Sequence, residues 1–457
     1  MKGENIMPTR PSKVTLDTNA LNILNAIRNN ASNNYKDYVP PITDVSELKQ
    51  IGKIIMDVPA LQNEFLSALI NRIGLVVVTS KMFDNPWAMF KKGFLEYGET
   101  IEEIFVDLIR VFEFDAETAE TELFKRVAPD VRAAFHVMNY RKFYKVTIER
   151  QKLARAFLSA SGMGELITYI MNAIYVSASY DEFLTMKYLL ARNILNGRLY
   201  PVSVPAVSEA NMKSIVTKIK GTSNLIEFPS RKYNPAGVFQ HTDKANQYII
   251  IDTEFDASMD VNVLASAFNM DKADFMGRRV PIDGFGNLDN DRLAELFADD
   301  PSYVEITDDE KEALNAIPLA LVDEKFFMIY DNLNEFREVE NGQGLYWNYF
   351  FHQWKTFSTS PFSNALLYVP TEPSVTSVTV TPASATVSAG SNLSLSTAVV
   401  TTGFAPQTVT YSSNNDGVTI TEGGVVQIAS DATGTATITV TSTFDDSVSD
   451  TVAITIS

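Results

Sequence analysis

Apolar residues recur at helical spacing through residues 163–197, the longest patterned stretch of the chain. The pattern runs from Met163 to Ile194 without a proline, which predicts a long amphipathic helix of ~50 Å at about 1.5 Å per residue. Gly197 occupies the usual position of a residue that ends a helix. Ser179, followed three residues later by a glutamate, is also a capping-box pattern. The sequence therefore leaves two alternatives, one continuous helix or two consecutive helices.

A second pattern, in residues 101–115, is β-prone and places apolar side chains on both faces. Because a small domain cannot cover both faces, this segment is either a central strand or an extended hairpin whose second face another subunit covers. The pattern leaves both open. Lys91 and Lys92 form either a basic contact patch or a solvated hairpin tip. The candidate intersubunit contacts in this region are Phe90, Lys91, Lys92, Phe105, Ile109 and Phe112.

Shorter patterns predict the remaining elements. Helices are expected at residues 21–28, 60–72 and 209–220, strands at 73–78, 248–252 and 319–330, and a dense aromatic strand pair at 344–369. Residues 1–72 hold few apolar anchors, which indicates an arm and not an independent core. From Thr371 onward threonine, serine and valine dominate, and short alternating runs between turn residues predict a β-sandwich.

Composition narrows the classes of function. The net charge of −18 argues against a protein that wraps nucleic acid, because such a protein needs a basic face to neutralise phosphates. The absence of cysteine excludes disulfide bonds and thiolate chemistry and is typical of a reducing compartment. No uninterrupted apolar run reaches ~18 residues, and the N-terminal residues lack the apolar centre of a signal peptide. We therefore expect a soluble protein with no membrane-spanning segment.

The residues that usually carry chemistry form no recognisable site. His136, His241 and His352 are isolated and lack the spacing of zinc ligands. Glu102 and Glu103 are adjacent, so on a strand they would face opposite sides and could not cooperate as acid and base. We expect no catalytic residue, no cofactor and no metal. The hypothesis of a cytoplasmic enzyme therefore has no candidate active site.

Several collinear segments resemble one protein family. They are RIGLVVV, NPWAMFKKG, GETIEEIF, FDAETAE, NAIYVSASYDE, FDASMDVNVLASAFNM and GLYWNYFFHQWKTFS. Across most of residues 25–369 they resemble the major capsid proteins of small short-tailed phages of the phi-twenty-nine type. The C-terminal run, with SVTVTP, TYSSNN and GGVVQIASDATGTATITV, resembles a bacterial immunoglobulin-like group 2 domain, with Tyr411 where that group often has tryptophan.

The resemblance implies an α+β fold, the Hong Kong 97 type of phage capsid fold, followed by an immunoglobulin-like β-sandwich. In that fold a long spine helix, here within residues 163–196, packs on a β-sheet. The implied parts are an N-terminal arm in residues 1–72, an extended hairpin region in 73–134, a peripheral domain with the spine helix in 135–203 and 337–370, an axial domain in 204–336 and the immunoglobulin-like domain in 371–457.

The function that the resemblance implies is that of a major head protein. Such a protein self-assembles through pentamers and hexamers into an icosahedral or prolate shell around packaged DNA. The implied partners are further copies of the chain, a scaffolding protein and a portal, while DNA is enclosed without specific binding. Host surface carbohydrate is a candidate ligand of the C-terminal domain. The expected location is the virion, after assembly in the host cytoplasm, and the alternative is a cell-surface or adhesive protein.

Overall fold

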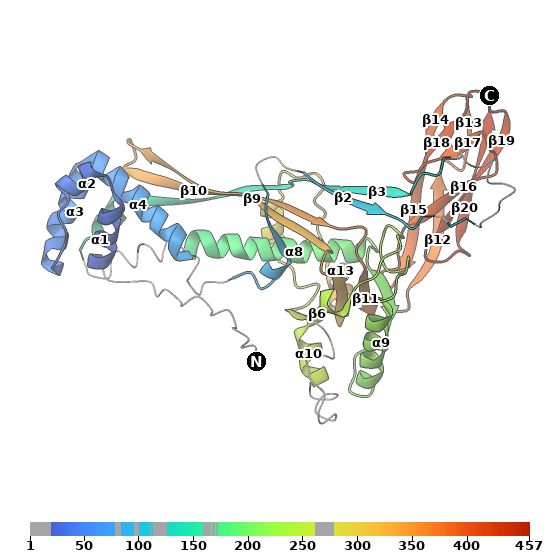
Figure 1. Ribbon diagram of the computed structural model, residues 1–457, viewed down its shortest axis with the longest axis horizontal. Coiled ribbons are helices and arrows are strands. Elements are labelled where there is room, and N and C mark those ends of the chain that lie inside the picture. The colour runs from blue at the N-terminus through green and yellow to red at the C-terminus, as the bar shows by residue number, and fades with distance from the viewer. Residues whose placement is uncertain are drawn as a thin grey trace. The chain divides into compact units, whose positions relative to one another are not determined.

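The computed structural model describes residues 20–77, 84–95, 100–109, 111–112, 126–158, 166, 170, 172–260 and 278–457 (Figure 1). The chain divides into two compact units. The first unit holds Met1–Glu99, Met138–Thr185 and Tyr330–Thr356, and the second holds Thr100–Val137, Met186–Ile329 and Phe357–Ser457. Both units combine helices with strands, which confirms the expected α+β class.

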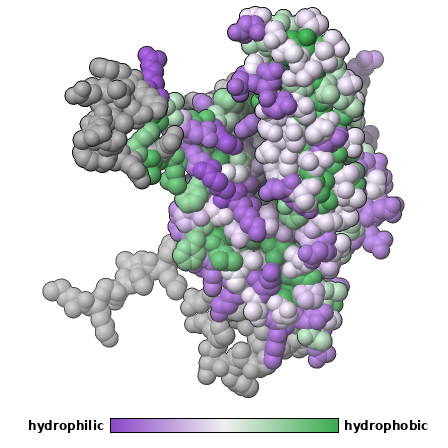
Figure 2. Space-filling view, turned by 90° about the vertical axis from the view of Figure 1, so that its right-hand side faces the viewer, coloured by the Kyte–Doolittle hydropathy of each residue, from purple (hydrophilic) through white to green (hydrophobic). Residues whose placement is uncertain are grey.

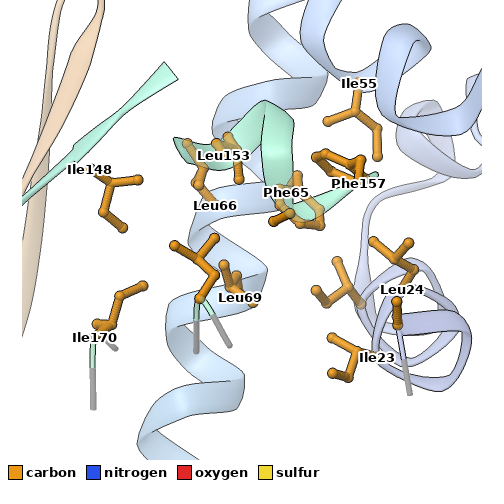
Figure 3. Packing of buried hydrophobic residues seen from close by; sticks show 14 of the residues in the cluster. Ile23, Leu24, Ile55, Phe65, Leu66, Leu69, Ile148, Leu153, Phe157 and Ile170 are labelled. Carbon is orange, nitrogen blue, oxygen red and sulfur yellow. The ribbon is translucent and has the colours of Figure 1, made fainter. Parts of the chain in front are cut away.

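Helices near the N-terminus line one side of a hydrophobic core in the first unit. They are α1 (Ala20–Asn30), α2 (Asn33–Tyr38), α3 (Leu48–Asp57) and α4 (Pro59–Val77). They pack with Leu153 of α6 (Arg150–Ala156) and with Phe157, whose ring centroid lies 5.4 Å from that of Phe65 (Figure 3). The helices that begin at Ala20 therefore carry many buried apolar residues and share their core with other parts of the chain, and an arm over residues 1–72 stays a prediction.

The predicted strand at residues 73–78 is wrong over its described part, because α4 continues to Val77. β-Branched residues favour strands only where a sheet surface packs against them. Here the run follows a helix without an intervening proline, and extending an existing helix costs far less than starting a new element. The predicted helix at residues 60–72 is confirmed as the first part of α4.

A four-stranded sheet with the order β1-β9-β10-β4 lines the other side of this core. Its strands are β1 (Lys91–Phe94), β9 (Phe327–Asn341), β10 (Tyr346–Thr359) and β4 (Tyr140–Glu149). β10 and β4 pair antiparallel. Trp347, Tyr349 and Phe351 alternate along β10 and are buried in the core, as the two-residue period of a strand requires.

The long predicted helix is present as α8 (Ser177–Leu195), which directly follows a π-helical turn, η3 (Asn172–Val176). Ser179 lies inside α8, so the alternative of a helix break at this residue is wrong. The π-helical turn is the irregularity instead. Gly197 follows the helix with φ of +62°, and its N–H donates to the carbonyl of Ile194 at 2.9 Å. Most of the expected helix before residue 172 lies outside the described residues.

A five-stranded sheet with the order β5-β11-β8-β6-β7 lies in the second unit. Its strands are β5 (Tyr200–Ser203), β11 (Ala365–Val369), β8 (Leu319–Asp323), β6 (Gln247–Asp252) and β7 (Arg278–Ile282). The strands predicted at 248–252 and 319–330 are confirmed. The strand pair predicted at 344–369 is wrong in its pairing, because β11 pairs with β5 and β8. Pro361 separates it from β10 and lacks the N–H that a continued ladder needs.

Helices accompany this sheet in the second unit. They are α9 (Met212–Leu225), α10 (Thr253–Met259), α12 (Asn290–Leu296) and α13 (Asp308–Asn315). The predicted end of the 209–220 helix at Gly221 is wrong, because α9 continues through this residue. A glycine inside a helix costs only about 1 kcal/mol, and α9 buries Ile215 and Ile219 in the core of the unit, which offsets that cost.

The C-terminal residues form short strands, as predicted. They are β12 (Ser374–Thr381), β13 (Ser384–Val387), β14 (Asn392–Ser394), β15 (Ser396–Thr402), β16 (Val409–Ser413), β17 (Val418–Ile420), β18 (Val425–Ile428), β19 (Gly434–Ser442) and β20 (Ser449–Ile456). Their sheets have the orders β12-β15, β13-β20-β19-β16 and β14-β18-β17 and share one core that includes Val378, Val426 and Ile438. Figure 2 shows much of the surface in pale shades, the range in which threonine, serine and glycine fall.

We expect Gly197→Ala to destabilise the second unit. A Cβ at this position would lie 2.6 Å from the carbonyl oxygen of Ala405, and the backbone holds φ of +62°. Strain of this kind costs about 1–3 kcal/mol. Gly221→Ala is the matched control, because a Cβ there meets nothing within 4 Å and the residue lies in a helix. Thermal unfolding should show a lower Tm for Gly197→Ala only; equal Tm values would contradict this account.

Candidate assembly surface

The second unit carries a two-stranded antiparallel ribbon formed by β2 (Ile101–Val106) and β3 (Val131–His136). The register pairs Ile101 with His136 and Val106 with Val131. Of the two alternatives that the sequence leaves open, the hairpin is therefore present, and a central strand is wrong for the described residues. The paired strands start and end later in the chain than the predicted region, residues 73–134.

One face of the ribbon packs against its own unit. The ring of Phe105 stacks on that of Phe362, with centroids 5.8 Å apart. A carboxylate oxygen of Glu103 accepts a hydrogen bond from Ser360 Oγ at 2.8 Å, and the other lies 3.2 Å from Nε2 of His136, which is buried. These contacts fix the inward face of the ribbon to the second unit.

The opposite face of the ribbon is apolar and exposed. Directly paired residues of two strands point to the same side of a sheet. The outward side chains are Glu102, Ile104, Val106, Val131, Ala133 and Phe135. Ile104 is 58% and Phe135 is 64% exposed. Antiparallel ribbons usually bury their apolar face and expose a polar one, so a contiguous apolar face in solvent is typical of a surface that another chain covers.

Exposed apolar residues continue beyond β2. The carboxylate of Asp107 accepts a hydrogen bond from the backbone N–H of Leu108 and forms an ion pair with Arg231 at 2.5 Å. These two contacts anchor the start of the segment. The residues that follow are Leu108, Ile109, Val111 and Phe112, all exposed. We call these four residues, together with Ile104, Val106, Val131 and Phe135, the ribbon surface.

The predicted contact residues on the ribbon differ in accessibility. Phe105 faces inward on Phe362, whereas Ile109 is 74% and Phe112 is 49% exposed on the ribbon surface. The contact role of Ile109 and Phe112 stays a prediction. Sequence reasoning missed Phe135, although the alternation of apolar residues from Val131 onward was a signal for a second strand.

The other predicted contact residues lie in the first unit. Phe90 is 1% exposed and packs edge-on against Trp87, with ring centroids 5.8 Å apart. The side chain of Phe90 is therefore interior in the single chain, and its contact with another subunit stays a prediction. Lys91 and Lys92 begin β1 as half-buried residues, which excludes a fully solvated hairpin tip.

Lys91 belongs to a buried cluster of four charged side chains in the first unit. Its ammonium lies 2.6 Å from Asp331 and 3.2 Å from Glu182. Lys355, only 2% exposed, contacts the same carboxylate of Glu182 and lies 2.5 Å from Asp331. Asn85 donates a further hydrogen bond to Glu182 at 2.7 Å. Two ammonium groups and two carboxylates thus balance each other inside the protein.

The pKa values of Glu182, Asp331 and Lys91 shift toward the charged forms. Burial raises the pKa of Glu182 and of Asp331, but Lys355 and Lys91 outweigh burial and hold both pKa values below the ordinary range. Burial likewise opposes the charge of Lys91, but Glu182 and Asp331 raise its pKa above the usual value. Because these groups stay ionised at neutral pH, the cluster is a structural ion-pair network and not an acid–base pair.

Other chemical groups remain separate. Among the residues that the structure describes, no three histidine, aspartate or glutamate side chains gather in a way that could hold a metal ion. His136 is on the inward face of the ribbon, His241 is exposed near Asp243, and His352 is on β10. In the same described part, no helix combines the length and the apolarity that crossing a membrane requires.

Comparison with known proteins identifies the family. Residues 24–369 match the family described as Phi29-like phage major capsid protein. The chain belongs to this family. It is 35% identical over 432 residues to the major capsid protein of Bacillus phage B103, which covers 93% of this chain and 90% of that protein. It is 36% identical over 423 residues to the major capsid protein of Bacillus phage GA-1, and the aligned residues make up 90% of this chain and 83% of that protein.

A phage major capsid protein is a component of the virion, so the predicted function and location are confirmed. The alternative of a cell-surface or adhesive protein is not supported by these matches. Among solved structures, the chain is similar to the capsid structure of Staphylococcus phage Andhra, with 13% identity and a TM-score of 0.49. That likeness covers 64% of this chain and 86% of the other.

Proposed function

We propose that copies of this chain assemble into a closed phage head shell by covering one another's ribbon surface. The observation that carries this proposal is the exposed apolar face of β2 and β3, whose other face is held by contacts such as that of Phe105 with Phe362. Burial of apolar area contributes about 25 cal/mol per Å², so one covered ribbon surface contributes only a modest free energy. Repetition of this contact through pentamers and hexamers stabilises the shell.

The proposal includes a Hong Kong 97 type arrangement. In it α8 is the spine helix, the β1-β9-β10-β4 sheet belongs to the peripheral domain, the β5-β11-β8-β6-β7 sheet belongs to the axial domain, and the ribbon is the extended hairpin. The length of α8, 19 residues after the π-helical turn, supports its role as a spine. The C-terminal strands are proposed to be an immunoglobulin-like sandwich, which their shared apolar core supports.

The proposed partners follow from this role. A scaffolding protein and a portal would guide assembly, and packaged DNA would be enclosed without specific binding. The net charge of −18 supports the last point, because tight binding of DNA needs an excess of basic residues. The C-terminal strands would face outward, where they can meet carbohydrate of the host surface.

Assembly is tested directly on the expressed protein, with and without a candidate scaffolding protein. Sedimentation and negative-stain microscopy should reveal closed particles in at least one of these conditions. A chain that stays monomeric in both, while folded by circular dichroism, would contradict the proposal.

We expect a chain truncated after Val369 to keep its ability to assemble. Val369 ends β11, and the strands that follow have a hydrophobic core of their own, separate from that of the five-stranded sheet. Removal therefore leaves the ribbon surface and both remaining cores intact. Particle yield by sedimentation should stay within about threefold of the full chain, and a truncated chain that folds but forms no particles would overturn this expectation.

A further inference from the structure

The second unit contains a cleft of about 1460 Å³ between the C-terminal strands and the residues around β5. One wall is formed by Arg132, Arg198, Arg231 and Lys232, and the other by residues of β16, β17 and their neighbouring loops. The family match ends at residue 369, so it includes only the first of these walls. A ligand that needs both walls would therefore be bound only by chains that carry such C-terminal strands.

Positive charge dominates the lining of this cleft. It contains four cationic side chains and one carboxylate, that of Glu422. Arg198 is exposed, and its side chain makes no ion pair or hydrogen bond within the described part of the chain, while its backbone N–H donates to the carbonyl of Asn193. Arg231 pairs with Asp107, and Arg132 lies 3.5 Å from Asp130 and 3.9 Å from the 91% exposed carboxylate of Glu422. Arg198 and Lys232 therefore carry most of the excess positive charge of the cleft. In a chain with a net charge of −18, such a local excess focuses an attractive field for anions.

Aromatic rings and hydroxyl groups lie beside these cations. Tyr200 meets Tyr233 edge-to-face, with centroids 5.4 Å apart, and Phe444 at 6.0 Å. The opposite wall adds Tyr411 and several threonine residues, among them Thr410. Ring faces suit the C–H faces of sugars, and hydroxyl groups donate to and accept from sugar hydroxyls. The cleft therefore combines recognition of anions with recognition of polyhydroxyl compounds.

We propose that this cleft binds an anionic glycan, a sugar chain that carries carboxylate or phosphate groups. Arg198, Arg132 and Lys232 pair with the acidic groups, and Tyr411 and Thr410 on the opposite wall contact the sugar rings and their hydroxyl groups. The proposal deepens the carbohydrate part of the proposed function and rests on it only for placing the cleft on the outside of a shell. Binding itself is a property of the single chain.

A single-stranded nucleic acid fits the cleft less well. Its binding sites offer a row of free ring faces on which successive bases stack. Here Lys232 already lies over the ring of Tyr200 at 4.9 Å, and Tyr233 meets the same ring edge-to-face. An acidic peptide has charge but lacks the hydroxyl groups that the threonine-rich wall suits.

The experiment measures binding of defined probes to the full chain by isothermal titration calorimetry. The probes are an oligogalacturonate, a phosphorylated oligomannose, a neutral oligosaccharide of equal length, an oligothymidylate and a polyglutamate. The test variant combines Arg198→Glu with Lys232→Glu. The control combines Lys49→Glu with Lys53→Glu, which changes the net charge equally on the exposed side of α3.

We expect at least one acidic glycan to bind the wild type and the control with equal affinity, and the test variant about tenfold or more weakly. The proposal would be overturned if no acidic glycan bound, or if the test variant and the control bound the acidic glycan equally. It would also be overturned if the neutral oligosaccharide, the oligothymidylate or the polyglutamate bound as tightly as the acidic glycans. Particle yield of the wild-type chain separates the two proposals, because a wild-type chain that binds the glycan but forms no particles would refute assembly and not the cleft.

Discussion

Replacing both Ile104 and Phe135 with aspartate is expected to abolish particle formation while the single chain stays folded. Both side chains are more than half exposed on the outward face of the ribbon, so a single chain loses little when they become charged. In a shell the same positions would lie in an interface, where two unpaired carboxylates are costly to bury. Because the cost recurs in every copy, particle yield should fall at least tenfold, measured by sedimentation after normalising for folded protein.

Val400→Asp is the matched control for this result. Val400 is 55% exposed, close to the 58% of Ile104, but it lies on β15 in the C-terminal strands. The control should assemble normally. If it loses particles as the ribbon variant does, added charge and not the ribbon surface causes the loss.

Ile109 and Phe105 divide the test further. Ile109→Asp should block assembly without destabilising the single chain, since Ile109 is 74% exposed. Phe105→Asp should also destabilise the single chain, because the ring of Phe105 stacks on Phe362. An Ile109→Asp chain that assembles at normal yield would remove this residue from the proposed contact.

Lys355→Met is expected to produce the largest loss of stability in the first unit. The substitution leaves Glu182 and Asp331 buried with Lys91 as their one remaining cation in the cluster. Breaking a buried ion pair by removing one partner typically costs about 3–5 kcal/mol. Chemical denaturation should show this decrease in the free energy of unfolding, whereas Lys49→Met, on an exposed part of α3, should change it by less than about 0.5 kcal/mol.

A double variant separates charge balance from packing. Adding Glu182→Met to Lys355→Met leaves one lysine and one carboxylate, so part of the lost stability should return. A double variant that is less stable than Lys355→Met by the full cost of a second truncation would show that packing dominates.

Acid should weaken the same cluster. The folded chain holds the pKa of Glu182 below its ordinary value of 4.5 and that of Asp331 below 3.8. Their stabilisation is therefore fully present above these ordinary values and is lost as the pH falls through the lower folded pKa values. Stability measured from pH 7 downward should decline in this acidic range, and the decline should be smaller in the Lys355→Met variant.

Local patterns in the sequence predicted the elements whose period is unbroken. α8 and the C-terminal strands carry a regular apolar repeat, and β6 is a continuous apolar run that is buried on both faces. The run at residues 73–77 has strand-like residues but continues α4, since the helix before it sets the conformation. Residue preference alone could not reveal this.

Contacts between distant residues could not be predicted from the pattern. The partner of β2 is β3, and the sequence between Val106 and Val131 gives no measure of their register. The ion cluster joins Lys91, Glu182 and Asp331 from three separate parts of the chain. Each of these residues alone resembles an ordinary surface charge, so only the fold shows that they are buried together.

If neighbouring copies cover the ribbon surface in the particle, a thiol placed on that surface should lose its accessibility on assembly. The chain has no cysteine, so Ile104→Cys provides a unique thiol on that surface, and Ser394→Cys provides an exposed control on β14. Maleimide labelling is measured on unassembled chains and on purified particles of each variant. We expect thiol labelling at the Ile104 position to be rapid before assembly and at least tenfold slower in particles, with the labelling rate of the control unchanged. Equal labelling rates at the Ile104 position in chains and particles would contradict this expectation.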